Sequence, residues 1–577
     1  MSPAERERRS NASRRPPWQW VALFALGLCC AASIAALEFD LSALRDAGSR
    51  AEAWARLSTF LGAFGAPDLS AERLGQGLSL SLSTFSIALW GSGLGLVLGY
   101  TLALFASRAV WLGESRPGAG YAVRRVVLEL ARLALDVLRG VPDFAWALLI
   151  LTVPGPGAVT GVLAIALGVA GILGRIFSEL WDAVPARRYE ALRANGASRA
   201  QVFLYAVQPL CARPMLSFGL MRLECSVRNA SVIGVVGGGG LGAQLFEEFN
   251  FGNYAGVVTL LLFLLALTAS TDLASNFLRH HLRTDPTRSG ITVTGAATGH
   301  GNSQRRRTWA LLGCFGAAIA TLAAMTPDLL RAGSELWRVE WAWIGGQLAQ
   351  LFHPQLEARS WIEAAVSCRV PLAIGFLATL IGVVGAGWLA YPGSWAFQID
   401  SRQFTGEFAS PWTRFLRAAL LVVARATTLV LRSIPEVAWL FILAAFFRIG
   451  ALPGILAVGV HSIGVLGRVF VESIDNQAYR PFEQTFHGSR ATAFLYSAFP
   501  SSVREWSSYA FVQFEANVRA GVVVGIIGIG GLGERFHTSV QNFNLERASV
   551  FLIAMVLMTT IFDRLSRALK LGANALG

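Results

Sequence analysis

Residues 224–242 read ECSVRNASVIGVVGGGGLG, and residues 515–533 read EANVRAGVVVGIIGIGGLG. Ten of the nineteen positions are identical in the two stretches. Each copy places a glutamate and an arginine four residues apart inside an apolar run, so both charges lie on one face of a helix. The pairs are Glu224 with Arg228 and Glu515 with Arg519. Inside a membrane such charges are costly, so we expect them to face a neighbouring helix or a water-filled path rather than lipid.

Both copies end in glycines. They are Gly237, Gly239, Gly240 and Gly242 in the first copy and Gly528, Gly530, Gly531 and Gly533 in the second. We interpret each run as a close turn at the outer end of a helix, and we favour this over a gate that contacts substrate. A phosphate-binding loop is excluded because no lysine follows the glycines.

The composition is that of a membrane protein. The chain has 577 residues, of which 54% are hydrophobic and only 15% are charged, whereas soluble domains carry about a quarter charged residues. Several apolar runs reach the roughly 20 residues that a helix needs to cross a bilayer. The sequence therefore predicts an all-α integral membrane protein.

The net charge of +13 comes almost entirely from arginine, since Lys570 is the only lysine. We interpret the excess as the positive charge of cytoplasmic segments, and we predict no nucleic-acid partner. Leu571 follows Lys570, so the chain lacks the Gly-Lys-Ser/Thr loop that would hold ATP. The cysteines and histidines show no metal-ligand spacing. We therefore predict no metal site, no bound cofactor, no catalytic residue and no enzymatic activity.

The chain is organised as two similar halves. We predict a basic cytoplasmic tail, a first domain of six spans, a basic cytoplasmic linker and a second domain of six spans, over residues 1–17, 18–278, 279–307 and 308–577. Arg139-Gly-Val-Pro142 in the first half matches Arg432-Ser-Ile-Pro435 in the second. Six spans return the chain to its starting side, so the two halves have the same orientation. The prediction is about twelve transmembrane helices in two parallel six-helix repeats, with both termini in the cytoplasm.

A polar loop between two predicted spans carries the main functional signal. Residues 190–209 read EALRANGASRAQVFLYAVQP. This loop resembles the cytoplasmic coupling loop of bacterial ABC importer permeases, and the residues at the spacing of that family's pattern are Glu190, Ala191, Gly196 and Pro209. The resemblance implies the ABC type I importer permease fold, in which the loop forms two short helices that dock on an ATPase subunit.

The second half carries a shortened copy of this loop. Residues 483–500 read EQTFHGSRATAFLYSAFP, with Glu483, Gly488 and Pro500 at the corresponding positions. One residue is missing on each side of Gly488, and Gln484 stands where the pattern has alanine. We therefore expect the two halves to dock unequally.

Residues around both loops resemble the phosphonate-transport branch of these permeases. The resemblance covers about residues 125–280 and 420–570 and rests on the Arg-x-x-Pro, Gly-Arg, Glu-x-x-x-Arg and Gly-Gly-Leu-Gly motifs. That branch usually has one permease domain per chain, whereas here we predict two such domains fused in one chain of the bacterial inner membrane. The resemblance also implies import of phosphonate or a related phosphorus oxyanion, such as phosphite or phosphate, delivered by a periplasmic binding protein. The implied partners include two separate ABC ATPase subunits. These subunits, and not this chain, bind ATP and Mg.

The charged residues of the membrane interior allow two interpretations. The Glu–Arg pairs either neutralise each other and hold helices together, or the arginines line the path and attract an anion while the glutamates hold them in place. Arginine suits phosphorus oxyanions because its fork of donors matches their oxygens. Arg139 and Arg432 either belong to this path or extend to the membrane interface. A second class of function stays open: an ion-coupled secondary transporter with two six-span halves, in which the pairs relay a proton or an ion.

Overall fold

The computed structural model describes residues 18–37, 39, 47–112, 119–282, 316, 319–334, 337, 340–399, 410–447, 450–477 and 489–575. Within these ranges the chain is helical and contains no strand. The predicted basic tail, residues 283–307 of the predicted linker, and Glu483 and Gly488 of the second loop lie outside them.

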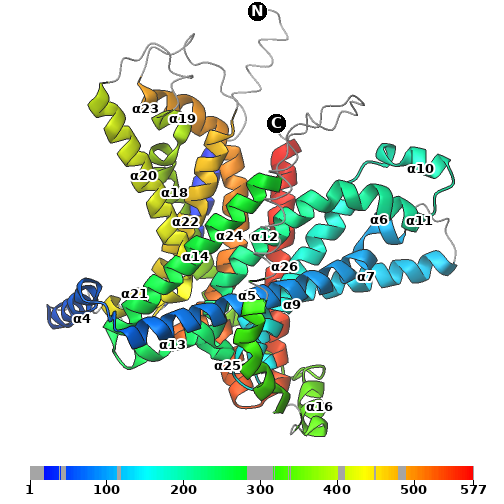
Figure 1. Cartoon of the computed structure of the whole chain (residues 1–577), viewed down its shortest axis with the longest axis horizontal. Helices are drawn as coiled ribbons and strands as arrows, with labels where there is room; N and C mark the ends of the chain where they lie inside the picture. Colours follow the sequence, from blue (N-terminus) through cyan, green and yellow to red (C-terminus); the bar gives the residue numbers. More distant parts are fainter. Residues whose placement is uncertain are drawn as a thin grey trace, which may run out of the picture.

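The two halves contain the same series of helices (Figure 1). The first half has α5 (Ala71–Ala106), α7 (Ala119–Gly140), α8 (Asp143–Ile150), α9 (Ala158–Asp182), α12 (Gln208–Ile233), α13 (Gly240–Asn250) and α14 (Tyr254–Leu282). The second half has α17 (Ala358–Ser367) with α18 (Arg369–Gly393), then α20 (Pro411–Ser433), α21 (Glu436–Phe447), α22 (Ala451–Asp475), α24 (Phe499–Val524), α25 (Leu532–Gln541) and α26 (Leu545–Ala575). Helix α14 continues to Leu282, past the predicted start of the linker at residue 279.

Seven of the described helices are long and apolar enough to cross a membrane, or eight if the bent pair α20 and α21 counts as one span. The predicted all-α membrane architecture is confirmed. Length and hydropathy mark fewer spans than the twelve predicted because some predicted spans are broken, carry charges or extend beyond the described ranges. Helix α12, for example, carries Arg222, Glu224 and Arg228 within one apolar run.

Proline breaks the third span of each half. Helix α7 ends at Gly140 and α8 begins at Asp143, while α20 and α21 meet at an angle of 95°. Pro142 has no N–H to offer to the carbonyl of Leu138, four residues earlier. The indole of Trp146 donates to that carbonyl instead, with an Nε1–O distance of 3.4 Å.

The second half repeats this solution. Trp439 donates its indole N–H to the carbonyl of Leu431 at 3.1 Å, and Pro435 lies four residues after Leu431. In both halves the tryptophan therefore satisfies the backbone group that the proline leaves unpaired, which is necessary where no water is available.

A tight turn follows α12 and α24. The chain leaves helical geometry at the glycines, and Gly237 and Gly528 have φ angles of +104° and +99°. A side chain on Gly240, where φ is +72°, would collide with Thr84 of α5. The glycine runs thus reverse the chain into α13 and α25 at a place where both φ and close packing require glycine.

The halves interlock through reciprocal contacts. Helix α14 packs against α20, and its counterpart α26 packs against α7, the counterpart of α20. Helix α13 contacts α21 through Phe249 and Phe441, whose rings stack with their centroids 4.8 Å apart. Their counterparts α25 and α8 are also in contact. This reciprocity is the pattern of a two-fold axis relating the two halves.

The first helix of each half crosses to the other half. Leu37, just after α2 (Trp18–Ala35), is buried in a core with Ile374 of α18 and Leu440 of α21. In return, Trp90 of α5 donates to Thr321 in the helical segment 319–334, with an Nε1–Oγ1 distance of 3.2 Å. Each half is therefore completed by a helix from its partner.

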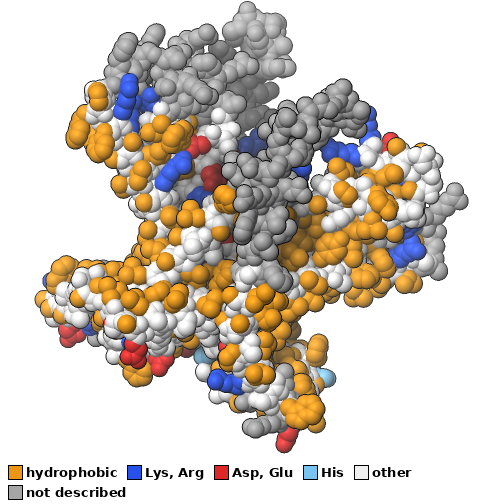
Figure 2. All heavy atoms as spheres, viewed as in Figure 1, with side chains coloured by type: hydrophobic (Ala, Val, Ile, Leu, Met, Phe, Trp, Pro, Cys, Tyr) orange, Lys and Arg blue, Asp and Glu red, His pale blue; other side chains and the backbone are white. Residues whose placement is uncertain are grey.

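Two arms diverge in Figure 1. One arm contains α18, α20 and α22 and ends near α23 (Arg490–Ala493), and the other contains α7, α9 and α12 and ends near α10 (Glu190–Ala194). Helices α13 and α25 lie on the side of the molecule opposite to α10 and α23. Hydrophobic side chains cover much of the visible described surface of both arms in Figure 2, as lipid contact requires.

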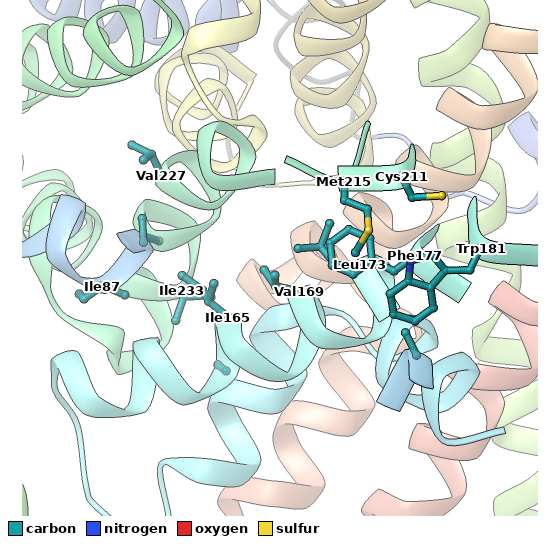
Figure 3. Packing of buried hydrophobic residues seen from close by; sticks show 14 of the residues in the cluster. Ile87, Ile165, Val169, Leu173, Phe177, Trp181, Cys211, Met215, Val227 and Ile233 are labelled. Atoms are coloured by element: carbon teal, nitrogen blue, oxygen red, sulfur yellow. The ribbon is translucent and has the colours of Figure 1, made fainter. Parts of the chain in front are cut away.

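The core of the first arm is continuous with the loop between α9 and α12. Figure 3 shows Val169, Leu173, Phe177 and Trp181 along α9, facing Met215 and Cys211 of α12. The Trp181 ring meets Phe203 edge to face at a centroid distance of 5.0 Å. Tyr189 and Phe203 of the loop belong to the same buried cluster. The loop is therefore packed into the same core as α9 and α12.

An aspartate at the end of α9 ties three helices together. Asp182 Oδ1 accepts from the hydroxyl of Ser107 at 2.7 Å and from the backbone N–H of Ala109 at 2.9 Å, at the start of α6 (Arg108–Trp111). Asp182 Oδ2 pairs with Arg132 of α7 at 3.2 Å.

Asp475 of α22 makes the same set of contacts in the second half. It accepts from Ser394 at 2.6 Å and from Ala396 N at 3.1 Å at the start of α19 (Trp395–Gln398), and it pairs with Arg425 of α20 at 2.9 Å. Each aspartate therefore acts as the hub of one arm.

Replacing either hub aspartate with asparagine should lower the stability of the purified chain. Asp182→Asn and Asp475→Asn each weaken charge-assisted hydrogen bonds, so we expect a loss of about 1–3 kcal/mol for each. The effects should add because the two sites lie in different arms. Thermal unfolding in detergent measures them. Glu179→Gln is the control, since the Glu179 side chain is 58% exposed and its ion pair among the described residues is with Arg175, four residues away. Unfolding midpoints equal to that of the control would contradict the role of the aspartates.

Candidate functional site

A cavity of about 280 Å³ lies between the two halves. Its walls come from α7, α8, α9 and α12 of the first half and α21, α22 and α24 of the second. The charged and titratable side chains in the wall are Arg139, Asp143, Arg222, Arg228, Glu436, His461 and Arg519. Four arginines thus face two carboxylates, which favours an anionic ligand.

Helices α12 and α24 each turn one polar face toward the cavity. On α12 this face carries Arg222, Cys225, Arg228, Asn229 and Val232, and on α24 it carries Gln513, Ala516, Asn517, Arg519, Ala520 and Val523. The spacing of three or four residues keeps these side chains on one side of each helix. The sequence analysis identified only the arginine of each Glu–Arg pair, although the same spacing would have indicated Arg222.

Asp143 lies at the first turn of α8 and organises the wall on the side of the first half. Its Oδ2 accepts from Asn229 Nδ2 at 2.5 Å and from Arg222 Nη2 at 3.4 Å. The side chains of Asp143 and Arg222 are 14% and 16% exposed. Gly168 of α9 leaves room for Asp143, since any side chain at position 168 would collide with Asp143 Oδ1. Sequence reasoning missed this carboxylate.

The second half has neutral groups at the positions that match Arg222 and Asn229, although Glu436 and Arg519 also line its wall. Gln513 Nε2 donates to Asn517 Oδ1 at 2.9 Å, and Asn517 Nδ2 donates to Thr379 Oγ1 at 2.9 Å. The positions that match Arg222 and Gly168 hold Gln513 and His461. His461 Nδ1 lies 3.0 Å from the carbonyl oxygen of Ile434, at the break between α20 and α21. The cavity is therefore asymmetric in charge although its walls are related by the repeat.

The two predicted Glu–Arg pairs behave differently. Glu515 Oε1 lies 3.3 Å from Arg519 Nη1, so the second pair forms along α24 as predicted. Among the described contacts no ion pair joins Glu224 to Arg228. Arg228 Nη1 instead donates at 3.0 Å to the backbone carbonyl of Arg432, at the end of α20, where helix carbonyls lack partners within the helix.

Glu224 pairs across the boundary between the halves. It lies 3.2 Å from Arg432 of α20 and 3.8 Å from Arg468 of α22, and 3.4 Å from Arg279 of its own half. Asp272 of α14 also pairs with Arg432. The expectation that Glu224 neutralises Arg228 is corrected here, because arginines that are distant in sequence occupy its carboxylate. We name Glu224, Asp272, Arg279, Arg432 and Arg468 the inter-half ion cluster.

The structure separates the predicted path residues into two groups. Arg139, Arg228 and Arg519 line the cavity, whereas Glu224, Arg432 and Glu515 are not among its lining residues. Arg139 lies 3.8 Å from Asp136 of its own helix. Both interpretations of the charges therefore have a place in the molecule: three arginines face the cavity, and Glu224 joins helices of the two halves.

The first coupling loop folds into short helices around Gly196. Helix α10 ends there with φ +81° at Gly196, whose N–H donates to Arg193 O at 2.9 Å, while Ala197 N donates to Leu192 O at 3.1 Å. This pair of bonds is the Schellman helix end, which favours glycine. Ser198 then caps the next helix, α11 (Arg199–Val202), in a capping box with Gln201.

One side of this loop faces outward and the other is anchored. Glu190 and Ala191 are exposed, whereas Leu192 packs on the core of the arm. Arg199 donates to the carbonyl of Leu112, next to α6, at 3.2 Å. Arg490 of α23 makes the equivalent bond to Phe397 O at 3.0 Å. Glu190 and Ala191 therefore lie on the exposed side of the loop, and its buried side connects it to the arm.

The predicted proline of each loop begins the next helix. Pro209 and Pro500 lie near the starts of α12 and α24, directly after π-helical segments over Phe203–Val207 and Phe494–Ala498. Gln208, which departs from the leucine of the importer pattern, accepts from the indole of Trp181 at 3.1 Å. This contact explains how a polar residue is tolerated there.

Two segments of the chain, residues 118–284 and 404–572, match the family described as the inner membrane component of binding-protein-dependent transport systems. The chain belongs to this family. Each match contains one coupling-loop segment, one polar face of the cavity and one glycine turn. The predicted fusion of two importer permease domains in one chain is thus confirmed.

Named relatives of this permease act on phosphorus oxyanions. The phosphate-import permease protein PhnE of Mycolicibacterium smegmatis is 26% identical over 473 residues, which is 82% of each chain. The phosphite transport system permease protein PtxC of Stutzerimonas stutzeri is 30% identical over 240 residues, covering 42% of this chain and 82% of the relative. Among solved structures, a chain of the inward-facing MetNI methionine ABC transporter aligns with 37% of this permease at a TM-score of 0.32 and 20% identity.

Removing the charge of Glu224 should weaken the junction between the halves. Glu224→Gln removes one buried negative charge from beside Arg432 and the neighbouring arginines. We therefore expect the free energy of unfolding to fall by about 3–5 kcal/mol. Glu515→Gln is the matched control, because among the described contacts Glu515 pairs with Arg519 of its own helix and not across the boundary between the halves. Thermal unfolding of both variants, and of Glu224→Gln combined with Arg432→Gln, gives the coupling energy. Equal destabilisation by Glu224→Gln and Glu515→Gln would contradict the assignment.

Proposed function

We propose that this permease is the membrane subunit of an ATP-driven importer for a phosphorus oxyanion, such as phosphonate, phosphite or phosphate. The observation that carries the proposal is the arginine-lined cavity between the two halves. Guanidinium groups bind phosphorus oxyanions through paired N–H donors at a fixed spacing. Arg228 and Arg519 line the cavity from opposite halves.

The substrate class is supported by two independent lines. The cavity wall carries more arginines than carboxylates, and the relatives named above are a phosphate-import permease and a phosphite transport permease. A cavity of about 280 Å³ also suits a small oxyanion with its hydration water, since one water needs only about 10–15 Å³ measured in this way.

The partners follow from the family and from the geometry of the coupling loop. A periplasmic binding protein delivers the substrate, and two separate ABC ATPase subunits bind ATP and Mg. The exposed side of α10 offers Glu190 and Ala191 to an ATPase, while Tyr189 and Leu192 connect the loop to the buried core of the arm. The permease lies in the bacterial inner membrane with both termini in the cytoplasm.

Purification of the tagged chain from its native membrane tests this proposal. We expect two ATPase subunits per chain to copurify, with ATP hydrolysis that stops when Glu190→Ala weakens the loop. Uptake of phosphate, phosphite or methylphosphonate by cells should require both the permease and ATP. Uptake by the purified chain that follows an ion gradient without ATP would replace this proposal with a secondary transporter.

Neutralising the arginine that faces the cavity from the second half should reduce uptake. Arg519→Gln removes one cationic fork from the wall, and the loss of a charge-assisted pair predicts a fall of about ten-fold or more in apparent affinity. Concentration-dependent uptake of radiolabelled phosphate measures it. Arg359→Gln, at an exposed arginine outside the cavity, is the control. Equal uptake by both variants would remove Arg519 from the path.

The two coupling loops should contribute unequally. Gly196→Pro cannot adopt the positive φ of the helix end and should uncouple ATP hydrolysis from uptake. Gly488→Pro should have a smaller effect, because the second loop is shortened in sequence. The ratio of transported substrate to hydrolysed ATP in the reconstituted complex is the measurement. Equal losses in the two variants would refute the asymmetry.

A further inference from the structure

The arginine-lined cavity contains a carboxylate that attraction of an anion does not explain. Asp143 is held in the wall by Asn229 and Arg222, and both contacts use Oδ2. No donor of the described residues is placed on Oδ1, which lies against the bare backbone of Gly168. An ionised carboxylate repels an anionic oxygen, so its presence at an anion site requires a reason.

A ligand that carries its own acidic hydroxyl supplies this reason. Hydrogenphosphate and the monoanion of an alkylphosphonate each keep one P–O–H group, whereas sulfate is fully deprotonated at neutral pH. A carboxylate can only accept hydrogen bonds, so it binds a P–O–H donor and repels an oxygen that has only lone pairs. The arginines bind the remaining oxygens of either ligand without distinguishing between them.

The cavity is asymmetric, and the first half has the groups that suit a carboxylate accepting a P–O–H hydrogen bond. Asp143 has the cationic Arg222 and the donor Asn229 beside it, while Glu436, at the matching position, has Gln513 and Ala520 in the corresponding places. His461 fills the position that Gly168 leaves open in the first half. Asp143 therefore accepts from both a guanidinium and an amide, and the residues at the matching positions around Glu436 do not repeat this arrangement.

We infer that Asp143 accepts a hydrogen bond from the P–O–H group of the transported oxyanion and makes the permease select protonated phosphorus oxyanions over sulfate. The inference rests on the proposed function, because it concerns the ligand of the same cavity. Arg222 and Arg519 bind the anionic oxygens, and Asp143 accepts the hydrogen bond that the P–O–H group donates. Asp143 is thus a specificity-determining residue that distinguishes two tetrahedral anions of similar size.

The test is equilibrium binding of radiolabelled inorganic phosphate to the purified full-length chain in lipid nanodiscs. Sulfate and methylphosphonate serve as competitors. In the unaltered permease, methylphosphonate should displace phosphate and sulfate should not. Asp143→Asn offers an N–H donor in place of the accepting oxygen, so phosphate affinity should fall about ten-fold or more. Sulfate should then compete with phosphate, and the ratio of the affinities for phosphate and sulfate should approach one.

The pH dependence separates recognition of the proton from a structural role. Raising the pH removes the acidic proton from methylphosphonate, so its binding to the unaltered permease should weaken because the dianion has no P–O–H donor for the Asp143 carboxylate. This weakening should disappear in Asp143→Asn. Glu179→Gln, which removes a carboxylate outside the cavity, should keep both the preference and the pH dependence.

Each result decides between the two proposals. If Asp143→Asn keeps the preference for phosphate, Asp143 is not the selector, although the proposed function stands. If Asp143→Asn fails to yield folded protein, Asp143→Glu takes its place: it keeps the accepting carboxylate, so retained preference supports the inference and equal binding of sulfate overturns it. If the unaltered permease binds neither phosphate nor methylphosphonate, the proposed substrate class and this inference both fail.

Discussion

A charge inside a membrane needs a partner, and the architecture of this permease depends on how that requirement is met. The buried carboxylate of Glu224 is surrounded by arginines of α14, α20 and α22. Because two of these helices belong to the other half, the charges are compensated only when the halves are docked. The same ions that would be costly in an isolated half therefore specify how the two halves fit together.

Backbone groups obey the same rule. The breaks at Pro142 and Pro435 would leave carbonyls unpaired in a medium without water, and tryptophan indoles satisfy them in both halves. The carbonyl of Arg432 is satisfied by Arg228 from the opposite half. The breaks can therefore open a cavity at membrane depth without exposing an unsatisfied peptide group to lipid, which is the condition for irregular backbone in a membrane.

Sequence reasoning reached the repeat and the short helices of the loop at residues 190–209 because these depend on local chemistry. Gly196 is an example, since a helix end with positive φ favours glycine wherever it occurs. The partners of Glu224 were missed because spacing along a helix indicates only the neighbour four residues away, whereas Arg432 is 208 residues distant. The hub Asp182 was missed for the same reason. Asp143 and Arg222 were detectable in part, because Arg222 shares a helix face with Arg228.

The exchange of first helices between the halves has a consequence for the order of synthesis. Leu37 is buried against Ile374 and Leu440, so α2 leaves the ribosome hundreds of residues before the surface that it covers exists. The early membrane intermediate must therefore hold α2 in lipid without its final contacts. The first half is therefore inserted before its fold is complete. Its fold is completed only after the second half has been synthesised.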